Sequence, residues 1–274
     1  MKKLSIMVVL ILVVITGRSQ SFEGTIKWTM KMEITDPKMK AQMEEAKKKL
    51  NDPATQAQMK EMQAKMNDPQ MKAMMDANPQ MKTQMETAMK MMQGGNVNSM
   101  IPTGMILQIK GGNTLTKMEG GIMDKAEILY EGDKNKSVRI DHANKTYTPM
   151  NTSTDKPEAA STAPKVTKTS ETKKILNYTC TKYIVESTDP RGKATKQVFW
   201  TTKEIDIDMK KLAQHRMRDN QFFYENIDGV PLRTEVTMPE GNMTMEVTDV
   251  KKESLSSGIF QIPAGYKEVK GMGF

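Results

Sequence analysis

Two hydrophobic periods alternate along this chain of 274 residues. Between residues 22 and 34, apolar side chains such as Ile26, Trp28 and Ile34 alternate with polar ones, which is the period of a half-buried strand. The same alternation returns in short pieces after residue 100, separated by turns rich in Gly and Asn. The pieces span residues 105–110, 114–119, 126–130, 137–141, 145–150, 178–187, 195–201, 221–226, 231–238 and 243–251. Many short strands at hairpin spacing predict an antiparallel sheet.

Residues 36–95 have a helical period instead, with four start signals. Asp-Pro or Asn-Pro pairs stand at residues 36–37, 52–53, 68–69 and 78–79. An Asp or Asn side chain caps the free N–H groups of a helix, and Pro suits the first helical position because it has no N–H to satisfy. Methionines recur at spacings of three and four, which is typical of one face of an amphipathic helix. The sequence therefore predicts four short helices with methionine faces, and a further helix over residues 207–217.

The predicted fold class is α+β, with one curved antiparallel sheet that carries a Met-rich amphipathic helical insertion at residues 36–95. We expect residues 20–274 to form a single β-rich domain, because strand patterns lie on both sides of the insertion. Residues 151–172 contain almost no large apolar side chain, so they cannot bury enough surface to fix themselves. They are predicted to form a flexible loop rich in Ser, Thr, Pro and Lys.

The first 19 residues are expected to be a signal peptide. Lys2 and Lys3 precede an apolar run over residues 6–15, which is too short to span a bilayer. Its cleavage would leave no transmembrane anchor and no cysteine near the new N-terminus for lipid attachment. The only cysteine, Cys180, rules out an intramolecular disulfide, and export without disulfides suits a bacterial envelope. We therefore expect a periplasmic or outer-membrane-associated protein.

Charge and composition argue against a nucleic-acid partner. The formal net charge is +8, of which Lys2, Lys3 and Arg18 lie in the expected signal peptide. The other basic residues are interspersed with acidic ones, and aromatic residues make up only 5% of the chain. Neither phosphate neutralisation nor base stacking therefore has a visible basis.

Catalytic motifs are equally hard to find. No serine stands in the setting of a nucleophile elbow or a Ser-x-x-Lys helix start. Cys180 falls within a predicted strand with no nearby His, which is typical of an inert thiol, and His142 is predicted to be a solvated turn residue. Glu204, Asp206 and Asp208 alternate, a pattern more typical of a solvated face than of a cation site. We expect no enzyme, no catalytic residue, no metal site and no cofactor.

The methionine faces are the candidate binding surface. Their burial would not outweigh the conformational entropy that ordering four helices costs, so the helices need a surface on which to lie. That surface is either the sheet of the protein itself or an apolar ligand or partner, because methionine adapts to varied apolar shapes. The candidate ligand-binding residues are Trp28, Met59, Met62, Met66, Met74, Met81, Met85, Met89 and Met92.

Copper offers another use for the same side chains. Thioethers select Cu(I), and Met59/Met62 and Met89/Met92 have a Met-x-x-Met spacing. Any amphipathic helix requires that spacing as well, and the insertion contains no Cys or His.

Four phrases of the sequence carry a resemblance to a known family. They are FEGTI at residues 22–26, DHANKTY at 141–147, YTCTKY at 178–183 and FQIPAGYK at 260–267. Over residues 22–35 and 100–270 the chain resembles the domain of unknown function 4412, which occurs in exported bacterial proteins. That family is similar to the LolA/LolB-like lipoprotein carriers, in which a curved antiparallel half-barrel holds acyl chains under a helical lid. The resemblance implies a half-barrel here, with the Asp-Pro helices over its concave face.

These patterns favour a non-enzymatic exported binding protein. It would hold an apolar ligand, a lipid or a lipoprotein acyl chain, between a curved sheet and the Met-faced helices. Two alternatives stay open. One is a periplasmic Cu(I)-handling protein that uses the methionine clusters, and the other is a structural or interaction module of the cell envelope with a protein partner.

Overall fold

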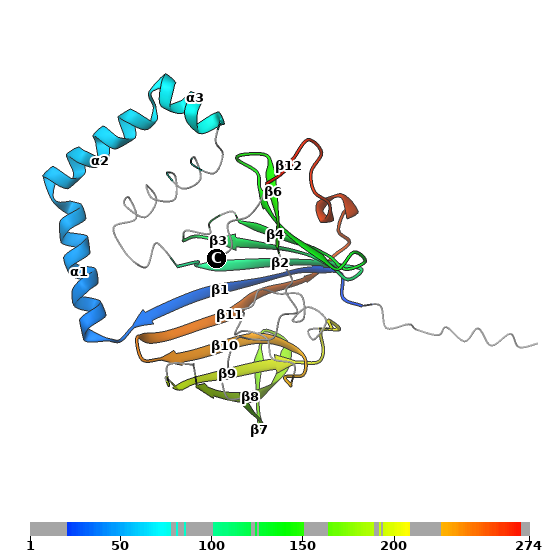
Figure 1. The fold of residues 1–274 in the computed structure, drawn as a ribbon. Coiled ribbons are helices and arrows are strands. Elements are labelled where there is room, and N and C mark those ends of the chain that lie inside the picture. Colours follow the sequence, from blue (N-terminus) through cyan, green and yellow to red (C-terminus); the bar gives the residue numbers. More distant parts are fainter. Residues whose placement is uncertain are drawn as a thin grey trace, which may run out of the picture.

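The fold consists of one large sheet and a helical arm (Figure 1). The computed structural model describes residues 21–77, 81, 85, 101–121, 124, 126–150, 164–188, 192, 194–208 and 226–269. The strands are β1 (Gly24–Ile34), β2 (Gly104–Lys110), β3 (Asn113–Glu119), β4 (Glu127–Glu131), β5 (Lys136–Asp141), β6 (Thr146–Met150), β7 (Lys165–Ile175), β8 (Tyr178–Thr188), β9 (Ala194–Thr202), β10 (Val230–Met238), β11 (Gly241–Lys252) and β12 (Lys267–Glu268). The helices are α1 (Pro37–Asn51), α2 (Pro53–Met66), α3 (Pro69–Ala77) and the short 3-10 helix η2 (Ser257–Phe260).

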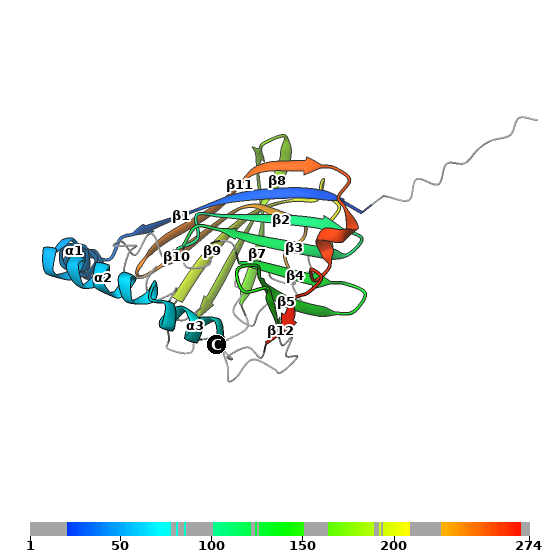
Figure 2. The same cartoon turned by 90° about the horizontal axis from the view of Figure 1, so that it is seen from above.

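All twelve strands belong to one sheet, in the order β12-β6-β5-β4-β3-β2-β1-β11-β10-β9-β8-β7. Every pairing is antiparallel except that of β12 with β6. Strand β1 lies near the middle, with β2–β6 on one side and β7–β11 on the other, and the sheet curves strongly between its two edges (Figures 1 and 2). The predicted curved antiparallel sheet and the α+β class are therefore confirmed.

The concave side of the sheet is identified by its core. Trp28 of β1, Tyr130 of β4 and Leu232 of β10 belong to one buried cluster. Strands β4 and β10 are separated by four other strands, so this cluster extends over much of one face of the curved sheet. We call the face that carries Ile26, Trp28, Met30 and Met32 the inner face, and the opposite face the outer face.

A second core covers the outer face of β3–β5. Leu115, Leu129, Val138 and Ile140 pack there against Phe260 of η2. The C-terminal segment therefore closes this side of the sheet with apolar side chains, and the polar alternation expected of a solvated outer face is lost in these strands.

The structure corrects the loop that was predicted over residues 151–172. Residues 165–172 belong to β7, which pairs with β8 along the edge of the sheet. Backbone hydrogen bonds to β8 order this segment, although Ile175 is its only fully buried side chain. Threonine suits a strand, and lysine on an edge strand discourages pairing with other chains. Residues 151–163 lie outside the described residues, as do nearly all of the predicted helix 207–217 and strand 221–226.

The three described helices begin where the sequence predicted. The side chain of Asp36 accepts a hydrogen bond of 2.6 Å from the N–H of Met39, and Asp52 and Asp68 cap α2 and α3 in the same way. Pro37, Pro53 and Pro69 each occupy the first position of their helix. The fourth start signal, at residues 78–79, lies outside the described residues.

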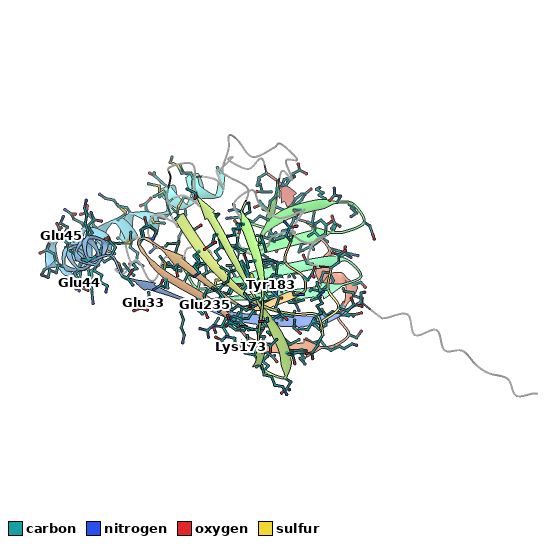
Figure 3. All side chains as sticks on the ribbon, turned by 90° about the horizontal axis from the view of Figure 1, so that it is seen from below. Glu33, Glu44, Glu45, Lys173, Tyr183 and Glu235 are labelled. Carbon is teal, nitrogen blue, oxygen red and sulfur yellow. The ribbon has the colours of Figure 1, made fainter. Side chains whose placement is uncertain are left out.

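Helices α1–α3, called the arm below, do not cover the inner face as expected. They extend beyond the end of β1 (Figures 1 and 3), and none of the three makes more than marginal contact with a described strand. Helices α1 and α2 bury no residue fully. Caps, together with i,i+4 ion pairs such as Glu45–Lys49 and Glu61–Lys65, stabilise them locally instead.

This division predicts that apolar truncations act differently in the sheet and in the arm. Leu107→Ala should lower the free energy of unfolding by about 2 to 5 kcal/mol, because Leu107 is only 1% exposed and its loss leaves a cavity. Met62→Ala, the matched control in the arm, should change it by less than about 0.5 kcal/mol. Urea unfolding measures both, and equal losses would contradict the separation of arm and core.

Candidate binding site

Methionines line the inner face where β1 runs toward the arm. Met30 lies opposite Met245 of β11, and Met32 lies opposite Met243. Met118 of β3 packs against the same core as Met30. Met245 is buried, whereas the other four are only half-buried. These five residues form the methionine face, an apolar surface that the core does not fully enclose.

Sequence reasoning missed the methionine face. Its residues lie in strands that are remote in sequence, and only the pairing of β1 with β11 brings Met30 and Met32 beside Met243 and Met245. The alternation Met-x-Met in both strands was the available signal, because period 2 places such residues on one side of a sheet.

The inner face becomes polar beyond β2. One row of residues paired across neighbouring strands runs from Leu107 of β2 over the next four strands. Its further members are Thr116 of β3, Ile128 of β4, Arg139 of β5 and Thr148 of β6. Thr116 is buried, while Ile128, Arg139 and Thr148 are half-buried. Next to this row lie the buried Thr114, Tyr130 and Ser137. The concave side therefore combines an apolar half with a hydroxyl-rich half that contains one guanidinium.

Trp28 is a core residue rather than part of an open surface. It is 2% exposed, and its indole Nε1 donates a hydrogen bond of 3.2 Å to the carbonyl oxygen of Pro231. The structure therefore does not bring Trp28 together with the methionines of the arm, which it was predicted to join.

The predicted site residues of the arm differ in exposure. Met62 is 44% exposed and Met74 is 57% exposed. Both lie three residues after a half-buried methionine, Met59 or Met71, which sets them about 60° to one side of the helix face. The half-buried group also contains Met66, Met81 and Met85. Met89 and Met92 lie outside the described residues.

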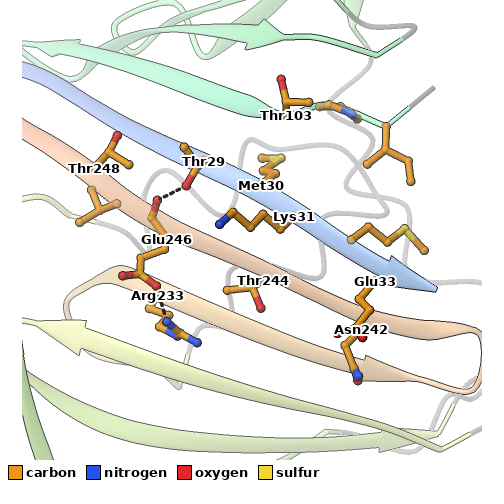
Figure 4. Close-up of a pocket in the computed structure, with 14 residues that line it drawn as sticks. Thr29, Met30, Lys31, Glu33, Thr103, Arg233, Asn242, Thr244, Glu246 and Thr248 are labelled. Carbon is orange, nitrogen blue, oxygen red and sulfur yellow. Dashed lines mark hydrogen bonds and ion pairs between the residues drawn. The ribbon is translucent and has the colours of Figure 1, made fainter. Parts of the chain in front are cut away.

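A groove of about 730 Å³ runs along the same strands, and Met30 and Met32 of the methionine face line it together with polar side chains (Figure 4). Most of its lining side chains belong to the outer face, among them Thr29, Lys31, Thr244 and Glu246. Arg233 is held there by ion pairs with Glu246 and, at 2.6 Å, with Glu235. The guanidinium of Arg233 is therefore paired within the groove, and apolar residues such as Met30 and Ile101 line the groove beside these charges.

His142 is an exposed turn residue, as predicted, with a side chain that is 47% exposed, but both of its ring nitrogens have a partner. Its Nε2 lies 2.7 Å from a carboxylate oxygen of Glu127, and its Nδ1 lies 2.7 Å from the hydroxyl of Tyr266. Lys117 adds an ion pair of 2.8 Å to Glu127. The cluster therefore fastens the C-terminal segment to β4 and the turn after β5, which is a structural role.

Reactive groups are scarce in the part of the chain that the structure describes. It contains no cluster of three or more His, Cys, Asp or Glu side chains that could hold a metal ion. Burial raises the pKa of the Cys180 thiol to about 11, and the side chain is fully buried. A thiol in this state is a poor nucleophile. No described helix is both long and apolar enough to cross a membrane.

The carboxylate of Glu127 should make stability depend on pH. Burial alone would raise its pKa, but hydrogen bonds from Lys117 and His142 outweigh burial and hold the pKa below 4.5. Stability gained from the charged carboxylate is thus present above pH 4.5 and is lost as pH falls through the lowered pKa. Glu127→Gln should cost about 1 to 3 kcal/mol at neutral pH, and this cost, measured by urea unfolding, should shrink progressively as pH falls below 4.5. A cost independent of pH would contradict this role.

The thiol of Cys180 should resist modification in the folded protein. At pH 8 we expect its reaction with a disulfide reagent to be at least roughly 100-fold slower than in urea-unfolded protein, because burial suppresses both access and the thiolate. One equivalent should react after unfolding. Rapid reaction of the native protein would show that the Cys180 side chain is accessible.

Comparisons with known proteins place the sheet in a family. No curated protein matches the chain. A solved LolA superfamily protein from Nitrosomonas europaea shares 13% identity over 58% of this chain and 80% of its own, with a TM-score of 0.25, which is too low to support an argument about function. The profile of the domain of unknown function DUF4412 matches residues 100–266, more than half of the chain, from the approach to β2 to Tyr266. The chain therefore belongs to the DUF4412 family.

Proposed function

We propose that this protein is an exported, non-enzymatic binding protein that holds an apolar ligand, such as a lipid or a lipoprotein acyl chain. The ligand would lie against the methionine face of the sheet and be covered by the arm. One observation carries the proposal, namely that methionines remain incompletely buried on both surfaces. Met62 and Met74 are exposed on the arm, and Met30 and Met32 are half-buried on β1.

The connection between the two surfaces supports this arrangement. Met30 and Met32 lie near the C-terminal end of β1. Strand β1 ends at Ile34, and α1 begins three residues later. The arm therefore starts at the border of the methionine face. Its far end, α3, lies on the side where β6 and β12 form the edge of the sheet (Figures 1 and 2). A rotation at residues 35–36 that breaks the backbone hydrogen bonds of these two residues to the carbonyl oxygen of Glu240 would bring the arm over the concave side.

Chemistry supports an apolar ligand of variable shape. Methionine is unbranched and polarizable, so a surface of methionines adapts to different apolar partners. Exposed apolar side chains cost free energy in water, and their burial by a ligand would recover about 25 cal/mol per Å². The arm makes little contact with the sheet, so covering a ligand would not require it to break a packed interface.

The proposal can be tested with a fluorescent fatty-acid probe and two matched double variants. Met62→Ser with Met74→Ser should weaken binding by about tenfold, because two apolar contacts are lost. Met62→Leu with Met74→Leu keeps the apolar surface and removes only sulfur, so it should bind like the unaltered protein. Replacement of residues 36–100 by a short Gly/Ser linker should leave a folded sheet with weaker binding.

Each outcome has a separate meaning. Failure of the intact protein to bind the probe, together with no lipid in native mass spectra of protein from its own envelope, would overturn the proposal. A loss that the leucine variant shares would point to the thioethers, and Cu(I) titration of the same two variants would then test the copper alternative. Circular dichroism of each variant checks that the sheet is intact.

A further inference from the structure

Arg139 places a positive charge on the partly enclosed inner face of the sheet. It lies on the inner face of β5, opposite Ile128 of β4 and Thr148 of β6. In the same row of paired residues, Ile128 lies next to Thr116 of β3, and Thr116 lies next to Leu107 of β2, which is part of the main core. The side chain is half-buried on the concave side, so water solvates it only in part.

Nothing in the described part of the chain neutralises this guanidinium. No described residue forms an ion pair or a hydrogen bond with Arg139. Asp141 shares its face two residues along β5, but the carboxylate of Asp141 accepts hydrogen bonds of 3.0 and 2.8 Å from Asn144. Arg233 on the outer face shows the contrast, because Glu235 and Glu246 both bind it. A partly desolvated charge without a partner is costly.

The surroundings of Arg139 suit an anion that belongs to a larger molecule. A guanidinium presents a planar fork of N–H donors that matches carboxylate and phosphate oxygens. Thr148 lies beside it in register, and Ser137 lies two residues away on the same face. The methionine face lies near this site as well. Its Met118 is two residues along β3 from Thr116, which belongs to the same row of paired residues as Arg139. Head group and chain of an amphiphile would therefore fit adjoining parts of one face.

We propose that Arg139 binds the oxyanion head group, a carboxylate or phosphate, of an amphiphile whose chain lies along the methionine face. This inference rests on the proposed function and narrows its ligand class from apolar molecules to anionic amphiphiles. The same surface would discriminate against neutral amphiphiles, because they leave the guanidinium unpaired when they displace its water.

Hexadecanoate and hexadecanol test the charge of the head group at constant chain length. The unaltered protein should bind hexadecanoate more tightly than hexadecanol. Arg139→Gln should weaken hexadecanoate binding by about tenfold or more, since hydrogen bonds to charged groups are of that strength, and should leave hexadecanol binding unchanged. Arg139→Lys keeps the positive charge but lacks the planar pair of N–H donors, so it should lose part of the affinity for hexadecanoate.

A matched control removes the same charge from the same strand. Lys136 lies on β5 in register with Glu131, on the outer face, and Lys136→Gln should leave both affinities unchanged. Equal weakening of hexadecanoate and hexadecanol by Arg139→Gln, or no weakening, would overturn the role of Arg139. Competition by inorganic phosphate at the same concentration as hexadecanoate would show a site for free anions and overturn the amphiphile class.

Failure of the proposed function has a different signature. If the unaltered protein binds neither hexadecanoate nor hexadecanol, the apolar site itself is absent, and the inference falls with it. If hexadecanol binds and hexadecanoate shows no preference over it, the apolar site stands and only the head-group inference is overturned. Urea unfolding of Arg139→Gln and Arg139→Lys separates loss of binding from loss of fold.

Discussion

The pairing of β1 on both of its edges is the constraint on which the rest of the structure depends. Antiparallel ladders join it to β2 on one side and to β11 on the other. Ladder hydrogen bonds fix register, and register decides which side chains share a face. The pairing thus sets Met30 beside Met245 and aligns the row that ends at Arg139. The family match begins at residue 100 and does not include β1, yet β1 is the strand that pairs with both halves of the sheet.

The concave side combines two kinds of surface because the two halves of the sheet differ in composition. Strands β1 and β11, with Met118 of β3, contribute the methionines, whereas the rest of the inner side of β3, β5 and β6 contributes mainly threonine, serine and one arginine. Apolar burial alone would favour filling such a concavity with side chains of the protein itself, as happens around Trp28. Half-buried methionines and a guanidinium without a partner among the described residues lie instead on the same concave side, and the proposed amphiphile site rests on these two features.

Much of the fold was predictable from local patterns. The ten strand patterns that lie within described residues all correspond to strands, and Asp36, Asp52 and Asp68 do cap helices. Strand β7 was missed because its order comes from pairing rather than from burial. The site was less predictable. Trp28 has the right pattern but lies in the core, and the methionine face requires a register between strands more than 200 residues apart, which no local period encodes.

The position of the arm between two paired neighbours has a consequence for how such proteins diversify. Strands β1 and β2 lie side by side in the sheet, so the segment between them begins and ends at the same place, whatever its length. The entropy of closing a loop rises only slowly with its length. The arm can therefore be lengthened, shortened or exchanged without disturbing the register of the sheet. Such a connection lets the arm evolve at a different pace from the sheet that carries it.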